Sequence, residues 1–122
     1  LLAVWCYELM QTTPEIDALL KTFYHDVVGA YWPADRRFIE EHYTTIPFPF
    51  QELPAPDFFI ETNWNLEEYV NYLATWSAVK RYREAGKGDP IPEIQRTLAA
   101  VWGPPDQVYP NRWPVYMRLG HL

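Results

Sequence analysis

The sequence predicts an α/β fold built on an incomplete sheet. Residues 1–7 form a continuous apolar run, the pattern of a strand that is buried on both faces. Two further strand-like segments, 58–64 and 112–122, are separated by segments with helical periodicity. A strand buried on both faces needs a neighbour on each edge, and this chain supplies few strands. We therefore expect an open sheet in which the edge at residues 1–7 is incomplete.

Two helices should follow the first strand. Thr13 can cap a helix at its start, and Pro14 suits the first turn. Apolar residues then recur at spacings of three and four, as expected for one helix face: Ile16, Leu19, Leu20, Phe23, Tyr24, Val27 and Val28. Pro33 opens a second, short helix over residues 34–42.

The segment at 45–56 is rich in proline. Pro47, Pro49, Pro54 and Pro56 exclude a regular helix and a central strand, because proline lacks the N–H group that both structures use. This pattern indicates an ordered, extended connection anchored by Phe48 and Phe50.

A strand at 58–64 leads into a predicted long helix at 66–85. Asn65 and Glu68 have the spacing of a capping box, and Gly86 ends the helix. Its apolar stripe is unusually aromatic: Leu66, Tyr69, Val70, Leu73, Trp76, Val79 and Tyr82. Such a stripe suggests a helix that lines a pocket rather than one that only fills a core.

A helix at 93–102 and a final strand at 112–122 complete the pattern. Gly103 closes the helix, and apolar and polar residues alternate along the strand. The count is three strands and about four helices. No repeat or long linker divides the chain, so residues 1–122 are expected to form a single, partial domain.

Composition restricts the partners and the compartment. The net charge is −6 and the pI is near 4.9, which makes nucleic acids and anionic membranes poor partners. Cys6 is the single cysteine, so no internal disulfide can form, and a reducing, cytoplasmic location is expected. Cys6 lies in an apolar run, which favours a buried, inert thiol.

Several kinds of site have no sequence signal. The five glycines never form a dinucleotide-binding fingerprint, and no metal-binding cluster of Cys and His exists. The three histidines, His25, His42 and His121, are scattered, and we expect each at the surface. We therefore predict no catalytic, cofactor-binding or metal-binding residue.

Aromatic residues nevertheless indicate a binding pocket, since they make up 17% of the chain. Trp76, Ser77 and Arg81 on the long helix could converge with Trp5 and Tyr7 at the carboxyl end of the first strand, where ligands bind in open α/β sheets. Tyr43 would close this pocket as part of a lid. The alternative is that these aromatic residues only pack the sheet.

Five segments carry a family resemblance. Residues 72–82, YLATWSAVKRY, and residues 42–52, HYTTIPFPFQE, resemble segments of class I S-adenosylmethionine-dependent methyltransferases near the trans-aconitate methyltransferases. Residues 1–7, 31–37 and 112–120 are similar to further segments of that branch, in the same order. The glycine-rich half of the family, which binds the methyl donor, has no counterpart in this chain.

The resemblance implies that the chain is the carboxyl-terminal, acceptor-side half of a Rossmann-like methyltransferase fold. The three strands would be strands 5, 7 and 6 of its sheet, in that spatial order, with the last strand antiparallel. S-adenosylmethionine would bind to the missing half, and the chain alone would be inactive. An arginine, Arg36, Arg37 or Arg81, could hold a carboxylate of a small-molecule acceptor.

Other functions stay open. The chain could be a non-catalytic module that self-associates as a homo-oligomer through the exposed strand edge, or it could pair with a donor-binding half. It could also be an independent small-ligand-binding α+β module of the cone-shaped, nuclear-transport-factor-like kind. The absence of an initial Met further suggests a piece of a longer protein.

Overall fold

The computed structural model describes residues 1–122, which divide into two compact units. The first unit comprises residues 1–10, 34–61 and 112–122. The second comprises residues 11–33 and 62–111.

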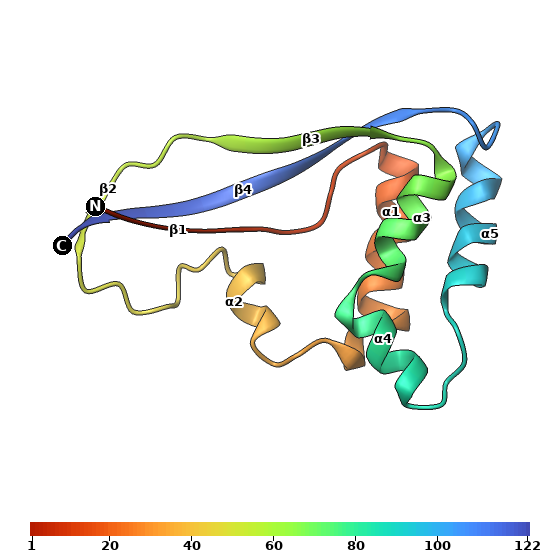
Figure 1. The fold of residues 1–122 in the computed structure, drawn as a ribbon, viewed down its shortest axis with the longest axis horizontal. Helices are drawn as coiled ribbons and strands as arrows, with labels where there is room; N and C mark the ends of the chain where they lie inside the picture. The colour runs from red at the N-terminus through yellow and green to blue at the C-terminus, as the bar shows by residue number, and fades with distance from the viewer. The chain divides into compact units, whose positions relative to one another are not determined.

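The sheet is organised around the last strand, β4 (Tyr109–His121). β1 (Leu2–Tyr7) pairs with β4 antiparallel, in a register that runs from Leu2 opposite Gly120 to Tyr7 opposite Val115. β2 (Gln51–Leu53) pairs antiparallel with the end of β4, and β3 (Phe58–Trp64) also pairs with β4 (Figure 1). The expected placement of the last strand between the first and the middle strands is confirmed.

β1 differs from the expectation of a strand buried on both faces. Alternate residues are exposed, with Trp5 53% and Tyr7 41% accessible, whereas Cys6 is buried. The face of β1 that carries Ala3, Trp5 and Tyr7 is therefore uncovered. β4 is the single neighbour of β1 in the sheet, so the other edge of the strand is open, as expected. Burial raises the pKa of the Cys6 thiol, which agrees with an inert side chain.

The proline-rich connection contains one short strand that the sequence did not reveal. Gln51–Leu53 lies between Pro49 and Pro54 and contains no proline, so it can form three residues of edge strand. Gly120 of β4 makes room for this connection, since a Cβ atom at that position would lie 2.7 Å from the Phe48 ring. The preceding helix, α2, is shorter than expected and spans Arg36–Glu40.

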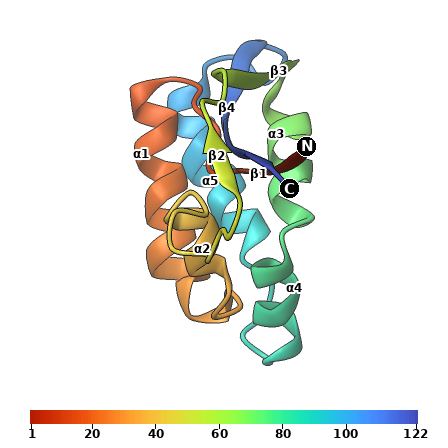
Figure 2. The same cartoon turned by 90° about the vertical axis from the view of Figure 1, so that its left-hand side faces the viewer.

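The second unit is a group of helices. α1 (Pro14–Thr22) starts as predicted, with the Thr13 side chain accepting a hydrogen bond from the Ile16 N–H group at 3.3 Å. It continues into a π-helical turn, η1 (Phe23–Val27), and a 3₁₀ turn, η2 (Gly29–Tyr31). α5 (Ile91–Trp102) contacts both α1 and α3, and Figure 2 shows it behind these two helices.

The predicted long helix at 66–85 is wrong, because it is two helices. α3 (Leu66–Ala74) begins with the expected capping box, and α4 (Ser77–Glu84) follows after a break. At the break, Trp76 has an extended backbone (ψ 135°), and the Thr75 hydroxyl donates a hydrogen bond to the Tyr72 carbonyl at 2.6 Å. This local bond stabilises a turn that competes with continued helix.

The core of the second unit is aromatic and aliphatic. Trp102 and Tyr69 are fully buried, with ring centroids 5.4 Å apart. The ring nitrogen of Trp102 donates to the Gln107 carbonyl at 2.8 Å, which satisfies its single donor. No helix in the chain combines the length and the apolar character that crossing a bilayer requires.

Candidate functional site

The first unit contains an apolar cavity of about 500 Å³. The residues 2–5 of β1 form one part of its lining, and the connection from Tyr43 to Phe50 forms the other. Phe48 and Phe50 contribute rings that are 5.4 Å apart and nearly perpendicular. The volume lies within the range of small-molecule pockets, and the lining suits a flat or aliphatic ligand.

Arg118 of β4 fixes the wall of this cavity. Its Nε and Nη2 atoms donate to the two carboxylate oxygens of Glu52, at 2.8 and 3.2 Å. Its Nη1 atom donates to the carbonyl oxygens of Tyr43 and Ile46, at 2.9 and 2.7 Å. Every guanidinium nitrogen therefore has a protein partner, and Arg118 acts as a structural tie for the connection.

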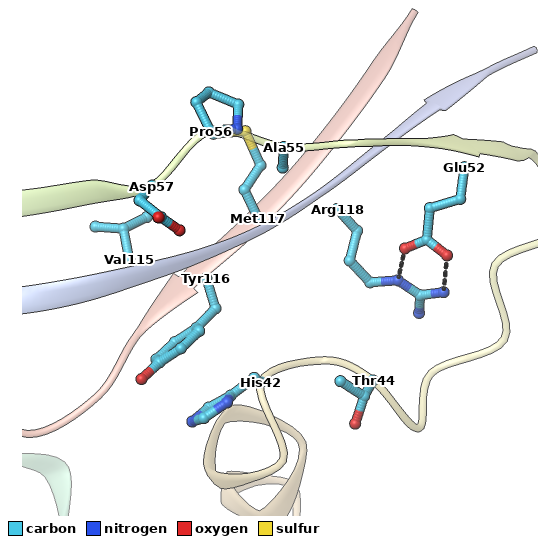
Figure 3. A pocket seen from close by; sticks show the side chains of 10 residues that line it. All are labelled: His42, Thr44, Glu52, Ala55, Pro56, Asp57, Val115, Tyr116, Met117 and Arg118. Atoms are coloured by element: carbon cyan, nitrogen blue, oxygen red, sulfur yellow. Dashed lines mark hydrogen bonds and ion pairs between the residues drawn. The ribbon is translucent and has the colours of Figure 1, made fainter.

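A second, polar cavity of about 430 Å³ lies beside β4. Tyr116 and Arg118 extend from β4 toward His42 and Thr44, whereas Met117 extends toward Pro56 (Figure 3). The lining also contains Glu52 and Asp57. Asp57 has no hydrogen-bond or ion-pair partner in the structure, and it is exposed at this wall.

His42, Glu8 and Tyr116 form a connected group at the polar cavity. His42 Nε2 lies 2.9 Å from Glu8 Oε1, and the Tyr116 hydroxyl donates to the same oxygen at 3.3 Å. The rings of His42 and Tyr116 stack with centroids 3.5 Å apart. Burial and the neighbouring Glu8 carboxylate raise the pKa of Tyr116, so its hydroxyl stays protonated at neutral pH.

The backbone that presents His42 is strained. His42 and Tyr43 have φ values of 55° and 62°, in the left-handed region that non-glycine residues rarely occupy. They follow α2 directly, where glycine is the usual residue. The hydrogen bond from the Tyr43 N–H group to the Phe38 carbonyl, 2.8 Å long, and the bond from Arg118 to the Tyr43 carbonyl hold this turn.

The structure brings two of the six predicted site residues to one cavity. Trp5 and Tyr43 both line the apolar cavity. Tyr7 lies at the end of β1, is 41% exposed and does not line that cavity.

The other three predicted residues belong to the second unit. The Trp76 ring contacts the rings of Phe23, Tyr24, Trp32 and Tyr72, with centroid distances from 5.3 to 6.3 Å. Ser77 is the first residue of α4, and Arg81 lies further along the same helix; both are exposed. Trp76 is thus the centre of an aromatic cluster within its own unit.

His42 reaches the surface as expected, but it has more contacts than a free surface residue. Its side chain is 35% exposed, and it is held by Glu8 and stacked on Tyr116. The three residues are far apart in the sequence, and no spacing rule connects them. Arg118 and Glu52 were missed for the same reason, since both lie in strands whose register the sequence does not specify.

Comparisons with known proteins give a consistent result. No family model matches the chain. Over 97% of its length, the chain is 27% identical to a putative methyltransferase of Dictyostelium discoideum, of which it covers 47%. It also superposes on the structure of a putative type II methyltransferase from Anaeromyxobacter dehalogenans, with a TM-score of 0.91 and 39% identity.

The chain is homologous to putative methyltransferases. The structural match covers 98% of this chain and 51% of the Anaeromyxobacter protein. The chain therefore spans about half the length of the relatives that it matches.

Proposed function

We propose that the chain is the acceptor-binding portion of an S-adenosylmethionine-dependent methyltransferase that acts on a small molecule. The observation that carries the proposal is the match of nearly the whole chain to half of a putative methyltransferase. The apolar cavity with Trp5 and Tyr43 supports the proposal. Methyl transfer depends more on holding the acceptor in the right position than on a pair of catalytic residues. The resemblance to the trans-aconitate methyltransferase branch supports the same assignment.

The residues of the chain do not fit S-adenosylmethionine itself. A donor site of the Rossmann type needs glycines at a turn from a strand into a helix. Gly86 and Gly103 instead follow the ends of α4 and α5. The donor would therefore bind to a part of the enzyme other than these residues, and the chain alone would be inactive.

Calorimetry and a methyl-transfer assay test this proposal together. The 122-residue chain should show no tight binding of S-adenosylmethionine. The product of the complete gene should transfer radiolabelled methyl groups from S-adenosylmethionine to compounds in a small-molecule extract. Tight donor binding by the chain alone, or no transfer by the complete product, would contradict the proposal.

Variants of the predicted site residues refine the test. In the complete gene product, Trp5→Ala and Tyr43→Ala, which both alter the apolar cavity, should raise KM for the acceptor more than KM for the donor. The matched control is Arg96→Ala, because Arg96 is an exposed helix arginine outside the proposed site. Unchanged acceptor kinetics in a variant would remove that residue from the acceptor site.

A second candidate function is a non-catalytic module that self-associates or binds a small ligand. The exposed apolar residues on two strands favour it, since Trp5 of β1 and Phe58, Phe59 and Ile60 of β3 are 40–53% exposed. Static light scattering distinguishes self-association from a monomer. A dimer that Trp5→Lys converts to a monomer would support this candidate, whereas a monodisperse wild-type monomer would exclude self-association.

A further inference from the structure

The polar cavity offers hydrogen-bond acceptors and almost no free donors. Four of the five N–H groups of Arg118 donate to Glu52 and to two backbone carbonyls. The Thr44 hydroxyl donates to the Glu41 carbonyl at 2.6 Å. The side-chain groups without a protein partner are the Asp57 carboxylate and one nitrogen of His42.

The free nitrogen of His42 is an acceptor when the imidazole is neutral. Nε2 faces the Glu8 carboxylate, which can accept a hydrogen bond but cannot donate one in its ionised form. The proton of a neutral imidazole therefore belongs on Nε2, and Nδ1 carries the lone pair. Stacking on Tyr116 and the left-handed turn fix the plane of the ring.

The charge around the cavity is negative. Three carboxylates, Glu8, Glu52 and Asp57, lie at the cavity or contact its lining, against the single guanidinium of Arg118. The lining also includes the apolar side chains of Pro56, Val115 and Met117 beside the Tyr116 ring. A ligand that matches this environment combines a positive hydrogen-bond donor with an apolar body.

We infer that the polar cavity is a binding site for a small organic ammonium compound. The ammonium group donates hydrogen bonds to Asp57 and to Nδ1 of His42, and the apolar body lies against Tyr116 and Met117. A carboxylate ligand fits this site less well, because Asp57 and the neighbouring Glu52 repel it and Arg118 keeps a single unpaired N–H group. The polar cavity shares Arg118 with the wall of the apolar cavity, but the proposed ammonium site does not depend on methyl transfer.

The strained turn supports a binding role. Two successive non-glycine residues in the left-handed region persist where the surrounding contacts require them, and such residues concentrate at ligand sites. In this chain the contacts of Arg118 and Glu8 maintain the turn and direct His42 at the cavity.

Three compounds of the same size test the inference. 2-Phenylethylamine, 2-phenylethanol and phenylacetate share a ring and differ in the head group. Titrations of the full chain, followed by NMR of the His and Tyr ring resonances, give the dissociation constants. We expect the amine to bind about tenfold more tightly than the acid, because the carboxylates attract one and repel the other. The alcohol should lie between them.

Variants locate the binding. Asp57→Asn and His42→Asn should each weaken binding of the amine by about two- to fivefold, as expected for a partly exposed charge or hydrogen bond. Asparagine tolerates the left-handed backbone at position 42, so this variant keeps the turn. Asp35→Asn is the control, because Asp35 is an exposed carboxylate of the same unit that does not line the cavity.

Three outcomes would overturn the inference. The first is tight or equal binding of phenylacetate, and the second is no saturable binding of 2-phenylethylamine. The third is an equal effect of Asp57→Asn and Asp35→Asn. None of these results depends on S-adenosylmethionine, so a failed methyl-transfer assay would leave this inference standing.

Discussion

The ion pair between Glu52 and Arg118 joins β4 to residues 43–52, the segment that contributes lining residues to both cavities of the first unit. Their hydrogen bonds join segments that are 66 residues apart in the sequence. Arg118 also lies over the Phe48 ring, with its Cζ atom 4.4 Å from the ring centroid. The Arg118 guanidinium thus makes an ion pair with Glu52 and a cation–π contact with Phe48.

The Glu52 carboxyl should make stability depend on pH. The hydrogen bonds from Arg118 lower the pKa of Glu52 below its ordinary value of 4.5. A group with a lower pKa in the folded state stabilises the fold above its unfolded-state pKa and loses that effect as the pH falls through the folded-state pKa. The difference in Tm between the wild type and Glu52→Gln should therefore be largest at neutral pH and should vanish in acid.

Thermal unfolding across this pH range checks the prediction. Asp106→Asn is the control, since Asp106 is an exposed carboxylate with no ion pair. A difference between the wild type and Glu52→Gln that stays constant into strong acid would show that the charge of Glu52 is not its cause.

Because His42 has a left-handed backbone, a glycine at this position should give a more stable protein than an alanine. His42→Gly and His42→Ala both remove the imidazole and its contact with Glu8. They differ in the cost of the positive φ, so the glycine variant should be more stable by about 1 kcal/mol. Urea unfolding of both variants gives the difference.

Lys80, an exposed residue in the middle of α4, supplies a control with the opposite expectation. At this interior helical position, Lys80→Ala should be more stable than Lys80→Gly by about 0.5–1 kcal/mol. If the alanine variant were also the more stable one at position 42, the strained conformation would not be the one populated in solution.

At the scale of elements, the capping box of α3 is the best defined helix start. The Asn65 side chain accepts from the Glu68 N–H group at 3.0 Å, and the Glu68 side chain accepts from the Asn65 N–H group at 3.1 Å. Asn65→Ala should lower the free energy of unfolding by about 1 kcal/mol. Asn71→Ala, at an exposed position inside the same helix, should have little effect, and equal losses in both variants would contradict the role of the cap.

Local sequence rules predicted the starts of elements better than their continuity. Thr13, Asn65 and the segment Phe58–Trp64 behave as expected, because a cap or a strand is specified by neighbouring residues. The break at Thr75 could not be seen in the apolar periodicity, because residues on both sides of it keep the same spacing. The folded chain reveals the turn through the side-chain bond from Thr75 to the Tyr72 carbonyl and the extended backbone of Trp76.

The candidate sites show the same limit. Trp5 and Tyr43 were grouped from the sequence, and they line one cavity. The group of Glu8, His42 and Tyr116 depends on the pairing of β1 with β4 and on a turn after α2, so its members are close only in the folded chain. Register and turn geometry are set by long-range packing, which a single sequence does not specify.

At the scale of the whole molecule, the negative charge predicts weak binding to polyanions. With a net charge of −6 and one short basic run, residues 80–83 of α4, the chain should pass through a heparin column at physiological salt and should not sediment with phosphatidylserine vesicles. Retention that decreases with rising salt would reveal a basic surface that the composition does not predict.

The two compact units are interleaved along the sequence. The chain passes from one unit to the other after Met10, Pro33, Glu61 and Asn111, and the strands β3 and β4 each contain one of these passages. No single cut can therefore release either unit as a continuous polypeptide. A truncation library screened for a minimal folded piece should return nearly the full chain, and evolution could exchange one unit only by exchanging the other with it.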